Sequence, residues 1–255
     1  MSSGRVTVIV PTYKHQDYLK CSILSILNST IPVEVIIVPV ASDQPTMDEL
    51  GRLRGVFESQ GTVKVVVSDK ADPFYQMQLG LDNVETEFFT IIGSDDFMLP
   101  NAVRRMLEIA VWSNVKNPIV GLSYAFTDEH LNVTKIETLR PFSFRRMMKG
   151  KGVIPDTALV KTDNVRQVDG FHINGWTSDF DHLKHYAMYH RLIKLPDTQV
   201  ILSPDIGCLY RQLPTSRHLT RYSTPEGIRL HRQRAKEIAR FYGNNNQKHV
   251  EWEAH

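Results

Sequence analysis

The sequence predicts an α/β fold in which a mixed, mostly parallel central sheet is flanked by helices and followed by a C-terminal helical segment. The first observation is that short apolar runs, typical of buried strands, alternate with segments of helical period. The second is that these runs end in polar residues, as strands of an open sheet do at their ligand-binding edge. With 255 residues, 42% of them hydrophobic and 23% charged, the chain has the composition of a soluble globular protein with a sizeable core.

Four strands with intervening helices are predicted before residue 100. The first strand, residues 5–10, ends at the turn Pro11-Thr12-Tyr13, and apolar residues at helical spacing then continue to Asn28. The further strands are residues 33–38, residues 63–67 and a run from Phe88, and the further helices are residues 47–59 and 74–83. This alternation predicts parallel strands joined by right-handed crossovers.

The fourth strand runs into Gly93-Ser94-Asp95-Asp96, which is the candidate site. Adjacent carboxylates at a strand end are hard oxygen ligands, suited to Mn²⁺ or Mg²⁺ that would in turn hold a diphosphate. The simpler alternative is a helix cap or a solvated loop. Pro100 is predicted to lie in the first turn of the next helix, whose apolar stripe is Val103, Met106, Leu107, Ala110 and Val111.

Charge, cysteine usage and missing motifs narrow the range of functions. The formal net charge is only +2, and Cys21 and Cys208 lie far apart without metal-ligand spacing. No uncharged apolar run reaches membrane-spanning length, so we expect a cytoplasmic protein without a transmembrane segment. No glycine-rich phosphate loop follows any predicted strand, which argues against a dinucleotide enzyme or a P-loop NTPase.

A basic segment closes the chain. Between residues 211 and 240 there are eight basic side chains and two acidic ones. Thr224-Pro225-Glu226 combines a capping residue, a first-turn proline and an acid near the positive end of the helix dipole, and it predicts a helix over residues 225–242.

Several of these segments together resemble a known family. Residues 8–14, the strand and loop over 34–43, Gln78-Leu79-Gly80 and residues 93–100 fall in the order and spacing of family 2 of the inverting, nucleotide-sugar-dependent glycosyltransferases, which have the GT-A fold. The similarity continues through three more segments, residues 154–160, 168–171 and 176–181, and covers about the first 215 residues.

The resemblance implies a division of the chain. A GT-A glycosyltransferase domain is expected over residues 1–215, with a nucleotide-sugar-binding half (1–100) and an acceptor half (101–215). Residues 216–255 are expected to be a basic helical extension. The oligomeric state stays open.

The resemblance also implies a role for each matching residue. Asp179 is expected to be the catalytic base, with Asp181 as the alternative. The metal, Mn²⁺ or Mg²⁺, would be held by Asp95, Asp96 and His218, although a solvated surface position is an open alternative for His218. The donor, with a UDP-sugar favoured, is expected to contact Pro11, Thr12, Tyr13, Asp43, Gln78, Ser94, Asp95 and Arg211.

The implied reaction is a direct displacement at the anomeric carbon with inversion. The metal would offset charge on the leaving nucleoside diphosphate while Asp179 takes the proton of the acceptor hydroxyl. The acceptor stays open between a saccharide, a lipid-linked saccharide and, because of the basic segment, a hydroxylated base of modified DNA.

Two departures from the family pattern keep other functions open. Pro39-Val40 stands where relatives usually carry acidic residues, and Gly93 stands where an acidic residue often opens the metal motif. A nucleotide-sugar-binding protein without catalysis is therefore an alternative. A nucleotidyltransferase is disfavoured, because the first strand lacks the phosphate loop that such enzymes need.

Overall fold

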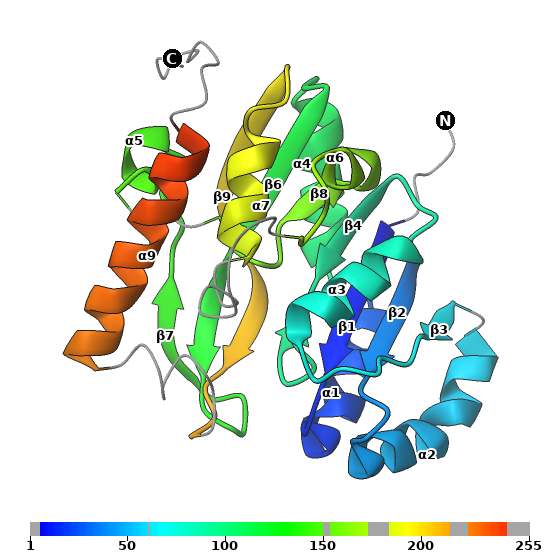
Figure 1. The fold of residues 1–255 in the computed structure, drawn as a ribbon. Coiled ribbons are helices and arrows are strands. Elements are labelled where there is room, and N and C mark those ends of the chain that lie inside the picture. The colour runs from blue at the N-terminus through cyan, green and yellow to red at the C-terminus, as the bar shows by residue number, and fades with distance from the viewer. Residues whose placement is uncertain (1–5, 61, 150–153, 173–183, 215–223, 244–255) are drawn as a thin grey trace.

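The computed structural model describes residues 6–60, 62–149, 154–172, 184–214 and 224–243. Within these residues nine strands form one twisted sheet (Figure 1). In spatial order the strands are β3 (Val63–Val65), β2 (Val33–Pro39), β1 (Val6–Thr12), β4 (Phe88–Ile91), β8 (Leu159–Lys161), β6 (Asn117–Thr127), β9 (Thr198–Arg211) and β5 (Phe97–Met98), and β7 (Val133–Glu137) pairs with β6 off this path.

Strand direction follows the prediction of a mixed, mostly parallel sheet. β1 to β4 run parallel to one another, and so do β6 and β9. Antiparallel pairing occurs at β8, which joins β4 to β6, and at β5 and β7. The fold class is confirmed, and the carboxyl ends of β1, β2 and β4 meet at one edge of the sheet, where α/β proteins bind ligands.

Helices cover both faces of the sheet, which explains why β1 and β2 are apolar along most of their length. Val6, Val8 and Val10 belong to the core shared with α1 (Gln16–Leu27), α2 (Gln44–Gln60) and α4 (Ala102–Trp112). Ile9 points the other way. It joins the core beneath α3 (Pro73–Asp82), α5 (Phe144–Met147), α6 (Thr162–Gln167) and α7 (Lys184–Leu192).

The expected elements are present with shifts at their ends, but the position predicted for Pro100 is wrong. α4 begins at Ala102 with Asn101 as its N-cap residue. Pro100 precedes the helix, and its carbonyl accepts a hydrogen bond of 2.9 Å from the Thr30 N–H. The apolar pair Phe97-Met98 forms β5, a short strand against β9 that lies between the turn after β4 and helix α4.

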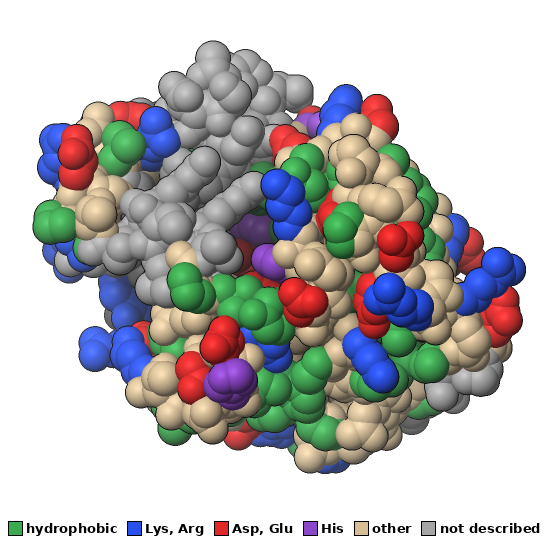
Figure 2. Space-filling view, turned by 90° about the horizontal axis from the view of Figure 1, so that it is seen from below, with side chains coloured by type: hydrophobic (Ala, Val, Ile, Leu, Met, Phe, Trp, Pro, Cys, Tyr) green, Lys and Arg blue, Asp and Glu red, His purple; other side chains and the backbone are tan. Residues whose placement is uncertain are grey.

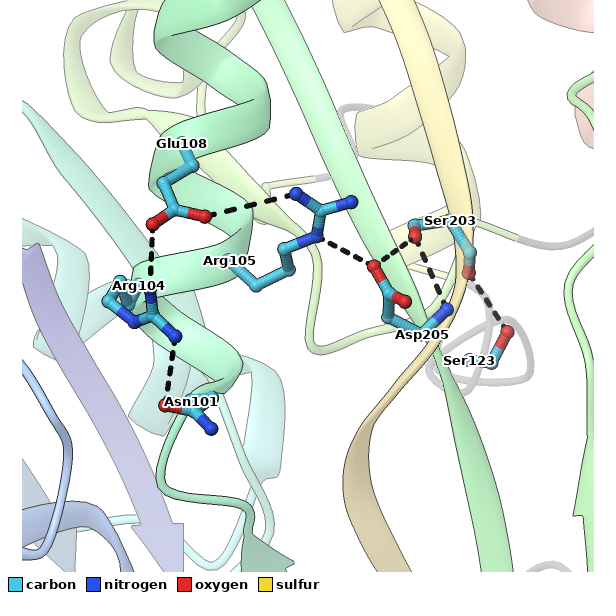
Figure 3. A network of polar contacts seen from close by, with 7 residues as sticks. All are labelled: Asn101, Arg104, Arg105, Glu108, Ser123, Ser203 and Asp205. Carbon is cyan, nitrogen blue, oxygen red and sulfur yellow. Dashed lines mark hydrogen bonds and ion pairs between the residues drawn. The ribbon is translucent and has the colours of Figure 1, made fainter.

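A polar network fastens α4 to β9 beside an irregularity in the sheet (Figure 3). Arg105 Nε lies 2.7 Å from Asp205 Oδ2, which also accepts a 2.8 Å hydrogen bond from Ser203 Oγ. Ser123 Oγ donates to the Ser203 carbonyl at 2.9 Å, at the position where the β6–β9 register shifts. The shifted register places Arg211 opposite Thr127 at the end of the sheet.

The predicted C-terminal helix is present as α9 (Pro225–Gly243). Thr224 Oγ1 accepts a hydrogen bond from the Gly227 N–H, as expected of a capping residue. Ala235 and Ile238 pack against Ala187 of α7, so α9 is docked on the main body through its apolar stripe. Among the described helices, none is both long enough and apolar enough to span a membrane.

Candidate functional site

The loops that follow β1 and β2 are tied together by a buried carboxylate. Lys14 has a positive φ of 59°, an unusual conformation for a residue with a side chain, and its N–H donates a 2.5 Å hydrogen bond to Asp43 Oδ2. The same oxygen accepts a 2.6 Å bond from Thr46 Oγ1. Asp43 therefore fixes the shape of the loop at Pro11, Thr12 and Tyr13, and its predicted contact with the donor stays a prediction.

Gln76 is a second tie between these strands, and sequence reasoning missed it. Its Nε2 donates to the carbonyl oxygens of Thr12 at 3.0 Å and Val38 at 2.5 Å, and its side chain is buried. A polar residue on the face of α3 that also carries Phe74 and Met77 is the signal that could have found it. One amide thus holds the carboxyl ends of β1 and β2 at a fixed separation.

The turn after β4 folds its carboxylates over a glycine. The Asp96 N–H donates to the Gly93 carbonyl at 3.1 Å, closing the turn. A Cβ atom on Gly93 would lie 2.8 Å from Asp95 Oδ1 and 2.9 Å from Asp96 Oδ2. A side chain at this position would therefore have to displace the carboxylates of Asp95 and Asp96 from their present places.

Asp95 faces the loop after β1 through a histidine. His15 Nδ1 lies 3.2 Å from Ser94 Oγ and 3.6 Å from Asp95 Oδ1. His15 is the N-cap residue of α1, directly after the Tyr13-Lys14 turn. The adjacency of β1 and β4 brings these two loops together, and sequence reasoning missed His15 because this strand order is not visible along the chain.

Asp96 is the buried member of the pair. Its Oδ1 accepts a 2.9 Å hydrogen bond from the Arg211 N–H. Burial, followed by the negative charge of Asp95, raises the pKa of Asp96 well above its usual range, while the contacts with Arg211 act in the opposite direction. Asp95 is the more accessible carboxylate of the two, with 16% of its side chain exposed.

Arg211 closes the site from β9. Its guanidinium lies over the ring of Tyr18, 4.4 Å from the ring centroid, and the residue is buried. Among the described residues, Arg211 Nε and Thr12 Oγ1 are buried polar atoms without a hydrogen-bond partner. Contacts therefore run without a break from Asp43 through Lys14 and His15 to the two aspartates and Arg211.

One predicted residue, Gln78, lies apart from this set. Gln78 Oε1 accepts a 2.9 Å bond from the Phe171 N–H and its Nε2 donates to Asp82 at 2.8 Å, so it anchors the turn at Gly170. Asp179 and His218 lie outside the described residues, as does the alternative base Asp181.

The chemistry of the carboxylates fits a cation. Asp95 and Asp96 bring two carboxylates together, and a cation would offset the repulsion between their negative charges, which adds to the effect of burial on the pKa of Asp96. In the part of the chain that the structure describes, no three His, Cys, Asp or Glu side chains lie close enough to hold a metal by themselves. A divalent ion at Asp95 would thus take further ligands from a bound diphosphate or water, as Mg²⁺ commonly does. Figure 2 views the molecule from this edge, and acidic and histidine side chains lie in and beside a hollow near its middle.

Solved structures with the same fold include two that hold a nucleotide or a nucleotide sugar. The structure of S. aureus TarS 1-349 in complex with UDP has a TM-score of 0.66 and 16% sequence identity, over 96% of this chain and 67% of that one. The mannosyltransferase PcManGT from Pyrobaculum calidifontis, in complex with GDP-Man and Mn²⁺, has a TM-score of 0.59 and 16% identity, over 94% of this chain and 74% of that one. These likenesses show a GT-A fold, and the strand-end carboxylates lie at its ligand-binding edge.

Sequence comparison gives the family. The model of the family described as glycosyl transferase family 2 matches residues 7–160, and the chain belongs to this family. An uncharacterized glycosyltransferase of Haemophilus influenzae is 22% identical over 216 residues, which are 83% of this chain and 80% of that protein. The minor teichoic acid biosynthesis protein GgaA of Bacillus subtilis is 26% identical over 106 residues, 40% of this chain and 24% of that protein.

Proposed function

We propose that the protein transfers a sugar, with inversion, from a nucleoside-diphosphate sugar to an acceptor hydroxyl. The observation that carries the proposal is the set of contacts joining the loop at Tyr13 to Asp95 and Asp96, which keeps that loop beside two carboxylates. Structural neighbours bound to UDP, UDP-GlcNAc and GDP-Man support a donor of this class, and a UDP-sugar is favoured.

Different residues of the site are proposed to bind different parts of the donor. The loop at Pro11, Thr12 and Tyr13 would bind the base, and Asp43 and Gln76 keep that loop in place. Asp95, with Asp96 beside it, would hold Mn²⁺ or Mg²⁺, and such a cation offsets negative charge on the leaving diphosphate. His15 restrains the side chain of Asp95.

Proton transfer is assigned to Asp179. A carboxylate at this position would accept the proton of the attacking hydroxyl, and the hydroxyl would approach the anomeric carbon opposite the leaving group. The configuration at the anomeric carbon of the sugar would thereby be inverted. The acceptor that we favour is a saccharide or lipid-linked saccharide, in keeping with a relative named for teichoic acid biosynthesis.

Donor binding tests the first part of the proposal. UDP and GDP are titrated against wild type and Asp95→Asn, with Mn²⁺ and with EDTA. We expect wild type to bind one nucleotide more tightly with Mn²⁺, and Asp95→Asn to lose that difference because an amide is a poorer ligand for a hard cation. Equal metal dependence in the variant would contradict the role of Asp95.

Turnover tests the second part. With the donor identified by titration, Asp179→Asn should keep donor affinity and lower release of the nucleoside diphosphate by about 10²-fold or more, the usual scale for loss of a positioned base. Full turnover in a folded Asp179→Asn variant would assign the base elsewhere. Donor binding without any turnover in wild type would favour the alternative of a nucleotide-sugar-binding protein.

A nucleic-acid acceptor is a second candidate because of one feature of α9. Arg229, Arg232, Lys236 and Arg240 line a hollow along one side of this helix. If they contact phosphates, retardation of duplex DNA in a gel should fall steeply between low and physiological salt. Absence of retardation at low salt would exclude DNA as the acceptor.

A further inference from the structure

Asp156 stands on a turn that is fastened on both sides, although its own side chain is 65% exposed. The carbonyl of Pro155 accepts hydrogen bonds of 3.0 Å from both the buried Tyr189 Oη and the Ala158 N–H. The carbonyl of Thr157 accepts a 2.8 Å bond from Thr90 Oγ1, within β4. The backbone around Asp156 is therefore fixed to the strand that ends in the Asp95-Asp96 turn.

Close packing adds to this rigidity. A Cβ atom on Gly121 of β6 would lie 2.8 Å from both Cγ and Cδ of Pro155, so the proline ring rests directly on the backbone of β6. A fixed backbone under an exposed carboxylate is unusual for a surface loop, where such side chains are normally free to move. It is the arrangement expected of a group that must meet a ligand in one position.

A buried histidine orients the carboxylate. His185 Nδ1 lies 3.5 Å from Asp156 Oδ1, and only 8% of His185 is exposed. Its ring is held edge-on between Phe74 and Phe171, with centroids 5.0 and 5.5 Å away. Among the described residues, His185 Nε2 has no hydrogen-bond partner, so the contact of the imidazole with Asp156 is made through Nδ1.

Asp156 shares its surroundings with the two site aspartates. The pKa of Tyr210 is raised by burial and then by the negative charges of Asp96, Asp95 and Asp156. Three carboxylates from two separate loops thus act on one neighbourhood at the carboxyl edge of the sheet.

We propose that Asp156 accepts hydrogen bonds from hydroxyl groups of the donor's sugar, and that His185 is the positioning residue that aims it. The inference rests on the proposed function, because the diphosphate at Asp95 sets where the sugar begins. A sugar joined to that diphosphate lies one linkage beyond Asp95, and Asp156 is an exposed, fixed carboxylate in that region. Carboxylate oxygens accept hydrogen bonds from paired sugar hydroxyls, so Asp156 would contribute to the choice of sugar.

The test compares each nucleoside diphosphate with its sugar conjugate. Calorimetric titrations with Mn²⁺ use UDP against UDP-GlcNAc and UDP-glucose, and GDP against GDP-mannose, on wild type and Asp156→Asn. For the conjugate that wild type binds, we expect Asp156→Asn to raise Kd about tenfold or more, the effect of losing a hydrogen bond to a charged group. The Kd of the free diphosphate should change less than about twofold.

His185 is tested with a matched pair of variants. His185→Leu removes the nitrogen that faces Asp156, and His185→Asn returns a donor near the position of Nδ1. We expect His185→Leu to raise the ratio of the conjugate's Kd to that of the diphosphate. In His185→Asn this ratio should return most of the way to its wild-type value. A merely structural role would lower stability in both variants without changing the ratio.

The outcomes distinguish a failure of this inference from a failure of the proposed function. If wild type binds no nucleotide, the proposed function fails and the inference fails with it. If wild type binds a conjugate and Asp156→Asn binds it equally well, the inference alone is wrong. Equal losses for the conjugate and the free diphosphate would also overturn it, because Asp156 would then act on the nucleotide and not on the sugar.

Discussion

Gln76 offers a direct test of how the nucleotide loop is held. Gln76→Met keeps the length of the side chain but removes the amide that binds the carbonyls of Thr12 and Val38. The residue is only 2% exposed, so water cannot replace these bonds. A buried carbonyl that loses its partner costs about 1–3 kcal/mol, and a buried methionine regains about 1 kcal/mol through apolar contact. Two carbonyls at about 1.5 kcal/mol each, less that gain, give an expected net loss of about 2 kcal/mol.

Thermal unfolding and nucleotide titration measure the result. For a chain of this size, about 2 kcal/mol corresponds to a fall in Tm of about 4–8 °C. Nucleotide affinity should fall at least about threefold, because the loops after β1 and β2 are no longer held apart by one group. Gln233→Met is the matched control, since Gln233 is exposed and its hydrogen bond to Glu237 lies at the surface, and its Tm should stay near that of wild type. A Gln76→Met variant that melts and binds like wild type would refute the reasoning.

Three further predictions concern pH and space in the site. The pKa of Asp96 in the folded protein is raised above 3.8, so its ionisation opposes folding once the pH rises above that value. Asp96→Asn, measured in EDTA, should therefore raise Tm at pH 7 but not near pH 3. An unchanged Tm at pH 7 would count against this reasoning. Burial lowers the pKa of His190 from 6.5 to about 4. As the pH falls from 6.5 to 4 the unfolded chain therefore binds a proton before the folded protein does, and the free energy of unfolding decreases. His190→Phe should reduce this pH dependence in denaturant titrations at several pH values, and an unaltered pH dependence would disprove the assignment. Gly93→Ala should displace a carboxylate, and Mn²⁺-dependent nucleotide binding should weaken in titrations; wild-type affinity would show that the turn has room.

The sequence was sufficient for the four strands β1 to β4 and for placing Asp95 and Asp96 at the end of the fourth. β1, β2 and β4 are buried on both faces, so their apolar runs could be read without knowledge of their partners. The strand-end rule then located Asp95 and Asp96 at the ligand-binding edge. Neither step depended on contacts between distant residues.

The parts that could not be predicted depend on such contacts. Gln76, His15 and Asp156 act through groups that are 29 to 79 residues away, and no local pattern marks them. β5 is a strand only because β9 offers it a partner. Pro100 was misplaced for the same reason, since a proline signal for a helix start cannot reveal that an extra strand precedes the helix.

The same long-range contacts make the site a product of both halves of the chain. Asp96 follows β4, yet its hydrogen bond comes from Arg211, 115 residues later, and β5 directly after it pairs with β9. The β6–β9 irregularity at Ser123 and Ser203 sets which β9 residue reaches Asp96. A change at the network of Arg105 and Asp205 could therefore alter the carboxylate pair without touching it, because the register of β9 connects the two.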